Sequence, residues 1–485
     1  MPSRIIFDVS TLSRWSGPPV GIVRVECELA RWARENIDRT MFVFFDPEIS
    51  AYRALNEKWV KPLIDRTISV SPWIAPNTRI RRRRSDRIPR AIKPAAMWIL
   101  QSRRSALLLL ERIRRLAKNS TLRSVAERLQ RPLITEKYRP FMFHADGTRK
   151  AILALDEFLG PEVEFTPADT LICAGAAWEH SDIYGIKLSK ERHGFRFVTL
   201  CHDIIPLQFP HFYKASDAAV FQTYYDVAFP LADLVVFTAH ASRRDALTYC
   251  KAHDLKVGET CVVSLGADGA AAGVTGEAAL PPGIERGRYA LFVSTIEPRK
   301  GHRLIYNVWL RLLTEGLPQK TGFKLVFVGR PGWKVDALIG QLKNNPGLQG
   351  SLQLLTSVND NQLAALYDGA AFCLYPSEYE GYGLPVIEAF LHGKAVLAST
   401  GGAIPEVVAG LSPCLDPHDE QLWHSMLTQW ISDPAARAPY EAAIRAQFRP
   451  ISWSASAQQF FDAAIAGPAA SREPAEISPV NLRQL

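Results

Sequence analysis

The chain has 485 residues, of which 47% are apolar and 22% charged, as expected for a soluble globular protein of two or three domains. It has no run of 18 apolar residues, which argues against a membrane-spanning helix, and its start, MPSRIIFDVSTLS, lacks the apolar stretch of a signal peptide. The seven cysteines show no CxxC pair, so the sequence favours a reduced, cytoplasmic protein over a disulfide framework or a zinc site.

Short, almost continuously apolar runs alternate with helix-length segments along the chain. Parallel strands that are covered on both faces have this composition, so the alternation predicts a doubly wound α/β architecture. The first series of predicted strands comprises residues 4–10, 41–46, 170–175, 195–203, 234–239 and 261–266, and the second comprises 289–295, 323–329, 352–356, 371–377 and 395–399.

A segment rich in Gly, Ala and Pro, residues 266–287, separates the two series and indicates a linker. We therefore predict two Rossmann-like domains, residues 1–275 and 276–465, which face each other across a cleft at the carboxyl ends of their strands. The tail, residues 466–485, has the composition of a disordered segment.

Positive charge is concentrated in residues 79–140, which contain 19 Lys and Arg against 4 Asp and Glu. Without them the net charge of the chain falls from +8 to −7. Arginine with an interfacial tryptophan suits an anionic membrane surface, so we predict a basic helical insert that contacts the inner face of the cytoplasmic membrane peripherally. A helical lobe with a solvated arginine face remains the alternative, and nucleic acid is disfavoured because no binding motif accompanies the charge. The apolar face of the predicted helix comprises Trp98, Leu100, Leu107, Leu110, Ile113 and Leu116.

The stretch YEGYGLPVIEAF places Glu380 and Glu388 on either side of a glycine-rich turn that leads into a helix. A helix N-terminus attracts phosphate, and Gly381 and Gly383 allow a ligand to approach the backbone closely. Glu388 is placed to accept hydrogen bonds from a ribose diol, and Glu380 points towards whatever lies beyond the phosphates. The alternative is a simple glycine turn followed by a glutamate that favours a helix start.

The longer run YPSEYEGYGLPVIEAFLHGKAVLAS resembles the E-x7-E signature of retaining, family-4-type glycosyltransferases of the GT-B fold, known as glycosyl transferases group 1 and frequent in bacterial surface-polysaccharide synthesis. The resemblance implies that Glu380 contacts the donor sugar and takes part in catalysis, and that Glu388 binds the ribose. It also places Gly381, Tyr382, Gly383 and Leu384 in the donor-binding loop.

A second motif, STIEPRKGH, places Arg299 and Lys300 on a proline-initiated turn after a strand. Fixed cations can neutralise a leaving diphosphate without a metal, although a lone Arg-Lys pair also suits a solvated turn. The motif resembles the EPRK loop of the same family, which implies that Lys300 and Arg299 hold the diphosphate. The chain has no D-x-D triplet, so no metal and no cofactor are expected.

Two further segments resemble nucleotide-side elements of the family. LVFVGRPGW is similar to the VGxxGW segment, which implies that Gly329 and Arg330 lie beneath the nucleotide. SVNDNQLAALYDGA is similar to the base-side loop, where Val358 would touch the base through its backbone. An ordinary glycine turn and an ordinary helix start, with Asp360 near the cap, are the alternatives.

The stretch VTLCHDIIPLQFPHFY ends a predicted strand at His202 and Asp203. The imidazole can hydrogen-bond a donor sugar, whereas a satisfied structural role is the alternative. The stretch resembles the HDxIPL element of bacterial family-4 enzymes, which favours a catalytic His202 with Asp203 on the acceptor side.

The acceptor side is also expected to include residues near the N-terminus. DVSTLSRWSGPPVGIVRVECELARW resembles the family's first loop, which lies over the diphosphate and the acceptor, with Gly21 and Arg24 as the candidate residues. GAAWEHSDIYG follows a predicted strand, where Trp178 would line the acceptor pocket.

The resemblance implies a retaining, metal-independent hexosyltransferase that works by front-face displacement. A nucleotide sugar, with GDP-mannose or a similar hexose favoured, would be the donor. A glycan or a polyprenyl-diphosphate-linked acceptor would be extended in the synthesis of lipopolysaccharide, O-antigen, capsule or exopolysaccharide. A non-catalytic glycan- or nucleic-acid-binding protein on a GT-B scaffold is the alternative.

Overall fold

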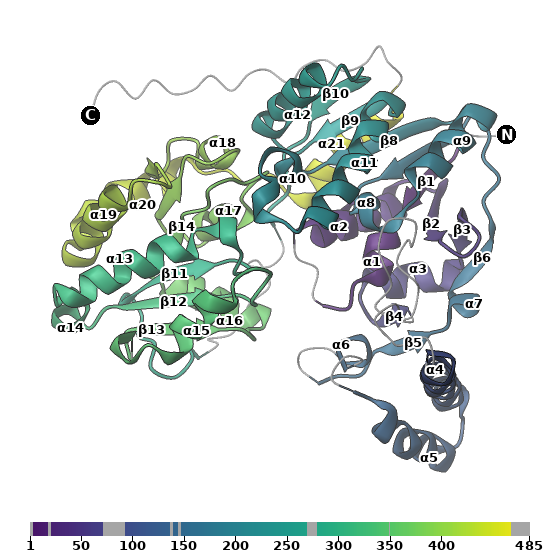
Figure 1. Cartoon of the computed structure of the whole chain (residues 1–485), viewed down its shortest axis with the longest axis horizontal. Helices are drawn as coiled ribbons and strands as arrows, with labels where there is room; N and C mark the ends of the chain where they lie inside the picture. Colours follow the sequence, from purple (N-terminus) through teal and green to yellow (C-terminus); the bar gives the residue numbers. More distant parts are fainter. Residues whose placement is uncertain are drawn as a thin grey trace.

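The computed structural model describes residues 3–17, 21–70, 93–135, 139–143, 147–268, 279–348 and 350–466, with backbone only for 93–102 and 140. Residues 79–92 of the basic segment, most of the predicted linker and the predicted disordered tail beyond 466 lie outside this description. Two sheets flanked by helices lie side by side (Figure 1). They confirm the predicted pair of α/β units with parallel sheets.

An eight-stranded sheet organises the N-terminal half of the chain. Its spatial order is β10 (Glu259–Val262), β9 (Leu234–Phe237), β8 (Arg196–Cys201), β7 (Thr170–Cys173), β1 (Ile5–Asp8), β2 (Thr40–Asp46), β3 (Ala51–Leu55) and β6 (Leu159–Glu162). The first six strands are parallel, and β3 and β6 extend the sheet in antiparallel pairing. The strand order reverses between β7 and β1, and ligands of open α/β sheets bind at such a switch point.

Helices cover both faces of this sheet. On one face the core includes α2 (Ile22–Asn36), α3 (Glu57–Ile64) and α21 (Trp453–Ile465). On the other it includes α8 (Ala177–His180), α9 (Ile183–His193), α11 (Ala215–Leu231) and α12 (His240–Ala252). Short helices α1 (Ser10–Arg14) and α10 (Ile205–Gln208) follow β1 and β8 at their carboxyl ends.

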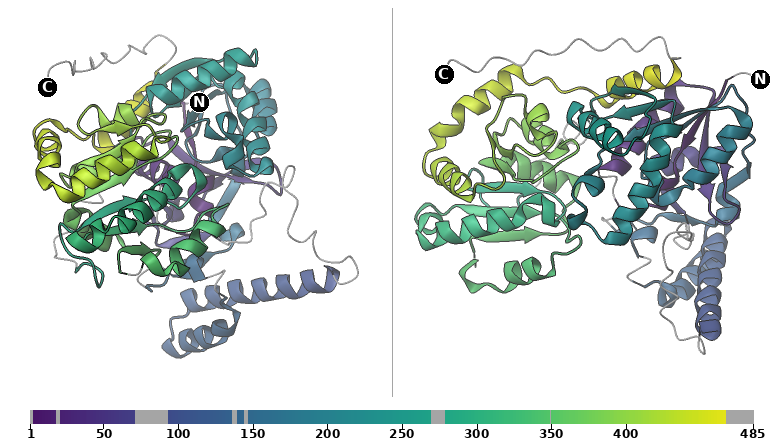
Figure 2. Two further views of the ribbon diagram at one scale, coloured as in Figure 1. Left: turned by 60° about the vertical axis from the view of Figure 1, so that its left-hand side comes forward. Right: turned by 45° about the horizontal axis from the view of Figure 1, so that its top comes forward.

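Helix α21 corrects the predicted domain division, which assigned residues 276–465 to the C-terminal domain. The Phe461 ring stacks on Trp32 at 5.3 Å and lies 5.9 Å from Phe7, so α21 packs in the N-terminal core. The chain therefore returns to its first domain after completing the second, and Figure 2 shows the yellow helix against the N-terminal sheet.

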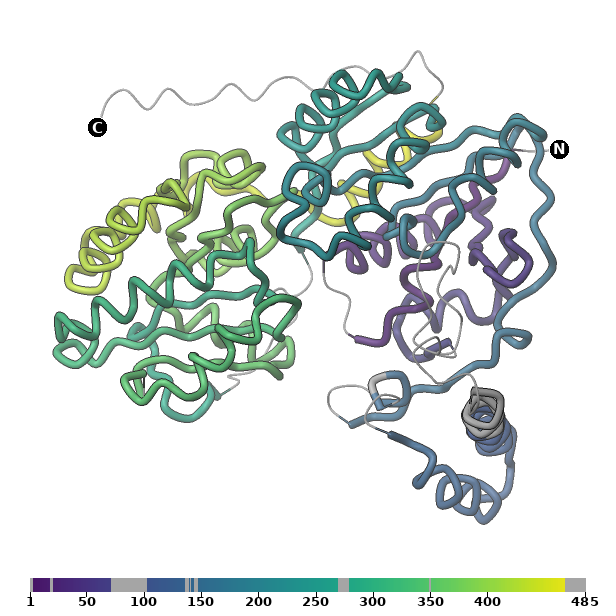
Figure 3. Tube along the Cα trace, viewed as in Figure 1, coloured from purple at the N-terminus to yellow at the C-terminus, as the bar shows by residue number. Residues whose placement is uncertain are grey.

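The insert begins and ends on a small parallel sheet of β4 (Ile68–Val70) and β5 (Ala151–Leu153). Between these strands lie α4 (Lys93–Leu116), α5 (Ser120–Gln130) and α6 (Arg139–Met142), and α7 (Leu155–Phe158) follows β5. The α4–α5 hairpin projects from the N-terminal half, as the tube in Figure 3 shows. No helix in the described part of the chain has the length and apolarity needed to cross a bilayer.

The prediction that the apolar residues of the insert helix share one face is wrong. Leu107 is buried in the insert, whereas Ile113 and Leu116 are exposed on the other side of α4. The side chains of Trp98 and Leu100 lie outside the described residues.

A six-stranded, fully parallel sheet organises the C-terminal half. Its order is β13 (Leu352–Leu355), β12 (Lys324–Val328), β11 (Tyr289–Val293), β14 (Phe372–Tyr375), β15 (Val396–Ser399) and β16 (Cys414–Leu415). Strand order reverses between β11 and β14. The helices are α13 (His302–Thr314), α14 (Leu317–Thr321), α15 (Asp336–Asn344), α16 (Asp360–Gly369), α17 (Leu384–Leu391), α18 (Ile404–Val408), α19 (Glu420–Ser432) and α20 (Ala438–Gln447).

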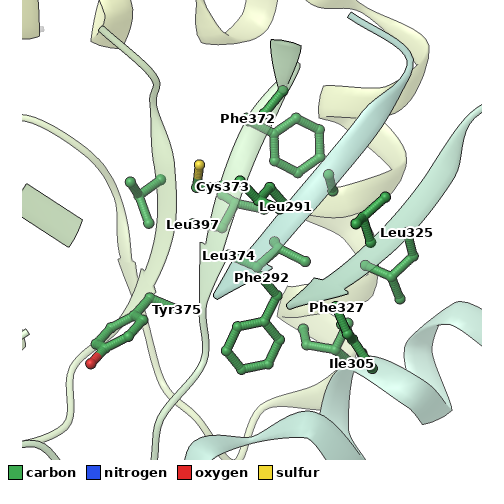
Figure 4. Packing of buried hydrophobic residues seen from close by; sticks show 14 of the residues in the cluster. Leu291, Phe292, Ile305, Leu325, Phe327, Phe372, Cys373, Leu374, Tyr375 and Leu397 are labelled. Carbon is green, nitrogen blue, oxygen red and sulfur yellow. The ribbon is translucent and has the colours of Figure 1, made fainter. Parts of the chain in front are cut away.

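The apolar runs that predicted these strands form the core of the C-terminal half. Figure 4 shows Phe292 of β11 and Phe327 of β12 packed beside each other, with ring centroids 5.4 Å apart and edge to face. Because this core fixes β11 and β14 as neighbours, it also fixes the two loops that leave them at their carboxyl ends.

Candidate functional site

Two loops leave β11 and β14 at the switch point of the C-terminal sheet and are joined by hydrogen bonds. The amide of Glu378 donates to the Arg299 carbonyl at 2.7 Å, and the Arg299 guanidinium donates to the Tyr379 carbonyl at 2.9 Å. The two motifs that were predicted separately from the sequence, EPRK and the E-x7-E run, therefore form one structural unit.

A buried ion cluster connects these loops. Lys300 Nζ lies 2.6 Å from one carboxylate oxygen of Glu380, and an Arg299 nitrogen lies 2.8 Å from the other. Glu380 is only 6% exposed, so these charges are largely removed from water. The structure thus brings together the predicted sugar-binding carboxylate and the two predicted diphosphate-binding cations.

The electrostatics of the cluster favour an added anion. Burial raises the pKa of Glu380, but the charges of Arg299 and Lys300 outweigh it and hold the pKa at about 2. Burial raises the pKa of the neighbouring Glu297 and Asp203 carboxyls, which opposes their ionisation. Glu380 is therefore ionised beside two cations, and cations held in this way can bind an added anion.

Residues of the N-terminal half lie against the same loop. A Cβ added to Gly381 would be 2.6 Å from the Asp203 Cβ and 2.7 Å from the His202 carbonyl oxygen, so only glycine permits this approach. The hydroxyls of Thr238 and Ser242 donate to the Gly381 carbonyl at 3.4 and 3.1 Å. No sequence signal assigned a role to these two hydroxyls, which hold the halves together.

His202 is held in one tautomer. Its Nε2 lies 2.9 Å from the Ala174 carbonyl oxygen, which can only accept, so Nε2 carries the hydrogen. Burial lowers the pKa of His202 to about 4, so the ring is neutral at physiological pH. Nδ1 is consequently a hydrogen-bond acceptor, on a residue whose backbone lies against Gly381.

Glu388 is bound from both halves of the chain. Arg24, in the first turn of α2, lies 3.2 Å from one carboxylate oxygen, and the Tyr367 hydroxyl donates to the other at 3.0 Å. Burial raises the pKa of Glu388. Glu388 and Tyr367 also line a pocket between α16 and α17, together with Ala267 and His392.

Several predicted residues have structural contacts instead of an evident ligand position. The Trp178 ring packs against Phe221 at 5.0 Å in the N-terminal core. The Tyr382 hydroxyl donates to the Leu265 carbonyl at 3.2 Å, and Leu384 packs against the N-terminal core. The contacts of Tyr382 and Leu384 bind the C-terminal loop to the N-terminal half, whereas the Trp178 contact lies within the N-terminal half.

The remaining predicted residues lie at the ends of elements. Gly21 caps α2 with a φ of 52°, and Gly383 caps α17 with a φ of 133°, both conformations that favour glycine. The side chain of Arg330 is exposed, Gly329 directly follows β12, and Val358 packs against the C-terminal core. Asn359, and not Asp360, caps α16, in a capping box with Gln362.

The described residues contain no group of three or more His, Cys, Asp or Glu side chains arranged to hold a metal ion. The expectation that neither metal nor cofactor is needed stays a prediction.

Residues 281–447 match the family model described as glycosyl transferases group 1. This segment is about a third of the chain, and we call it the group 1 domain because of this match. The group 1 domain contains the EPRK loop, the E-x7-E run and the pocket residues of α16 and α17, whereas Ala267 of the same pocket lies outside it.

Curated relatives of the group 1 domain include bacterial mannosyltransferases. O-antigen chain mannosyltransferase B of Escherichia coli is 33% identical over 175 residues, which are 36% of this chain and 45% of that protein. The serotype-specific mannosyltransferase WbdA of Escherichia coli is 26% identical over 290 residues, 57% of this chain and 34% of that protein. The chain thus spans less than half the length of these relatives.

A solved structure shows that the likeness extends beyond the group 1 domain. Anabaena Alr3699/HepE, solved in complex with UDP and glucose, superposes with a TM-score of 0.52 over 96% of this chain and 99% of that one, at 14% sequence identity. The described residues of the N-terminal sheet and of the group 1 domain therefore have the GT-B fold predicted from the sequence.

Proposed function

We propose that the protein is a retaining, metal-independent glycosyltransferase that transfers a hexose from a nucleotide sugar, with GDP-mannose favoured, to a lipid-linked or polysaccharide acceptor of a bacterial surface glycan. The observation that carries the proposal is the buried pairing of Glu380 with Arg299 and Lys300 beside the neutral His202. The mannosyltransferase relatives support the choice of sugar.

In this proposal the donor extends from Glu388 to Glu380. The ribose diol binds the Glu388 carboxylate, in place of or beside its contact with Arg24. The diphosphate binds Arg299 and Lys300. The hexose then lies between Glu380 and Nδ1 of His202, which accepts a hydrogen bond from a sugar hydroxyl.

The chemistry follows from the charges. The bond between the anomeric carbon and the diphosphate oxygen breaks as the acceptor hydroxyl oxygen attacks from the same face. The hydroxyl proton passes to the departing phosphate oxygen, and Arg299 and Lys300 neutralise the charge that develops there. Glu380, with a pKa of about 2, is ionised and stabilises the positive charge that develops on the sugar.

The test is a transfer assay with GDP-mannose, GDP-glucose and UDP-glucose and an O-antigen-type oligosaccharide acceptor, with the anomeric configuration of the product determined by NMR. We expect a product with the donor's configuration and a loss of about 100-fold or more in Glu380→Gln. Glu420→Gln, an exposed carboxylate on α19, serves as the control and should keep wild-type activity.

Three outcomes would contradict the proposal. An inverted product would exclude the front-face mechanism, and equal activity in Glu380→Gln would exclude the assigned site. Binding of glycan or nucleic acid without turnover of any nucleotide sugar would favour a non-catalytic binding protein.

A further inference from the structure

The α4–α5 hairpin of the insert exposes two apolar stripes. On α4, Leu109, Ile113 and Leu116 are 59%, 41% and 70% exposed. Their spacing of four and three residues places them on one side of the helix. On α5, Leu122, Val125 and Leu129 recur at a spacing of three and four residues and are 55%, 46% and 55% exposed. Large apolar side chains that are exposed side by side mark a surface that binds a protein, a membrane or another ligand.

The side of α4 opposite its stripe is already packed, and so is a side of α5 next to its stripe. Leu107 of α4 is buried with Met142 and Ile152, and Gln130 of α5 donates to the buried Glu111 of α4 at 3.0 Å. Arg115 pairs with Glu157 next to the N-terminal sheet at 2.5 Å. The exposed apolar side chains therefore take no part in the contacts that hold the hairpin in place.

The positive charge beside the apolar stripes favours an anionic partner. Arg112, Lys118, Arg123, Arg128 and Arg131 are all exposed on the hairpin or at its end. Arg112 lies three residues after Leu109 and four before Leu116, on the same side of α4. A second copy of the chain would bring like charges against like, whereas an anionic lipid surface would attract them and accept the apolar side chains.

The base of the insert, next to β4 and β5, contacts the segment between β1 and α2, which includes α1. Arg66, just before β4, donates to the Leu12 carbonyl at 2.9 Å, and Lys150, just before β5, donates to the Ser16 carbonyl at 2.8 Å. A partner that binds the hairpin would therefore lie on the side of the molecule where this segment is predicted to contact the acceptor.

We propose that the protein docks on an anionic lipid bilayer through the six exposed apolar side chains of α4 and α5 and the cations beside them. The apolar side chains enter the headgroup region, and the cations bind lipid phosphates. The docking is peripheral, does not require glycosyl transfer, and positions a lipid-borne acceptor near the loop between β1 and α2.

The full chain tests this in flotation with vesicles of phosphatidylglycerol and phosphatidylcholine, and with vesicles of phosphatidylcholine alone. We expect binding to the anionic vesicles, about tenfold or more weaker binding to the neutral ones, and weakening by high salt because ions screen the cations. The triple variant Leu109→Gln, Ile113→Gln, Leu116→Gln should bind anionic vesicles about tenfold or more weakly, with an unchanged melting temperature because its side chains are exposed.

A matched control replaces three other exposed apolar side chains of the N-terminal half, Ile49→Gln, Tyr184→Gln and Leu188→Gln, and should bind like the wild type. Wild-type binding by the α4 triple variant, or no binding by the wild type, would overturn the proposal. So would a wild-type dimer in light scattering that the α4 variant splits, because the stripes would then join two copies. Since no donor is present, a failure here leaves the proposed transfer reaction unaffected.

Discussion

Glu380 lies between two cations in a place that water barely reaches, and this arrangement has two consequences. The carboxylate compensates Arg299 and Lys300 while the site is empty of donor. It also competes with any diphosphate for the same cations. Since the attraction between buried charges is strong, the balance between these partners decides how tightly the nucleotide binds.

We predict that Glu380→Gln separates binding from catalysis. Removing the negative charge frees both cations for the diphosphate, so the affinity for GDP or UDP, measured by calorimetry, should rise a few-fold while transfer falls. The variant should also lose stability, by about 3 kcal/mol, because two buried charges lose their partner. Burial lowers the pKa of Lys300, and loss of its proton would limit this cost. Loss of nucleotide binding together with turnover would show that Glu380 mainly maintains the fold of the loop.

His302, at the start of α13, is buried beneath the EPRK loop. It is 1% exposed, its ring stacks on Phe292 at 4.1 Å, and neither ring nitrogen has a hydrogen-bond partner among the described residues. Burial lowers its pKa to about 3. Below the ordinary value of about 6.5, the unfolded chain therefore binds a proton that the folded chain does not, and stability falls as the pH is lowered.

We predict that His302→Phe reduces this acid sensitivity. Between pH 7.5 and pH 5, His302 should lower the free energy of unfolding of the wild type by about 2 kcal/mol. This contribution should be absent from the variant. Urea unfolding at both pH values measures the difference. His202, whose pKa burial lowers to about 4, keeps part of the acid sensitivity in the variant. The exposed His418→Gln is the control, and an equal loss in all three proteins would contradict the prediction.

The loop from β14 to α17 can approach His202 and Asp203 so closely only because Gly381 has no side chain. An alanine there would overlap Asp203 and the His202 backbone, and neither can move without shifting β8 or α10. The glycine therefore sets how closely the two halves can approach, in addition to any contact with a ligand.

We predict that Gly381→Ala lowers activity by about tenfold or more and lowers the melting temperature, because the halves cannot approach fully. Gly340→Ala is a sharp control: Gly340 lies in α15, where an added Cβ meets nothing within 4 Å. That variant should be stabilised by about 0.5–1 kcal/mol, since alanine favours the helix, with activity unchanged. Equal melting and activity in Gly381→Ala and the wild type would show that the loop can shift at little cost.

The elements differ in how far the sequence predicted them. The central parallel strands were predicted because burial on both faces makes them continuously apolar, as in β1 and β11. Strands β3 and β6 were missed because they extend the sheet in antiparallel pairing and are half exposed, so their sequences are mixed. The EPRK and E-x7-E loops follow strands, which made their meeting predictable, whereas the pairing of Arg24 with Glu388 depends on how the halves dock.

The two halves of the molecule are joined by contacts that no local sequence pattern predicts. Glu406 of α18 accepts hydrogen bonds from the amides of His240 and Ala241, at 2.8 and 3.1 Å, at the start of α12. The Trp333 side chain donates to the Phe212 carbonyl at 2.8 Å. A carboxylate at a helix N-terminus is stabilising, but here the helix belongs to the other half, so the sequence around either residue gives no sign of it.

The return of the chain to the N-terminal core leads to the last prediction, which compares two phenylalanines 13 residues apart. Phe461 of α21 is fully buried against Trp32 and Phe7, whereas Phe448 packs against Phe390 of the C-terminal core at 5.3 Å. Phe461→Ala should cost about 3–5 kcal/mol and raise hydrogen exchange in β1 and α2, with β14 and α17 protected as in the wild type. Phe448→Ala should cost less, because Phe448 is only partly buried, and should raise exchange in α17 and α20. If both variants raised hydrogen exchange in the same half, the prediction that α21 stabilises the N-terminal half and not the C-terminal half would be wrong.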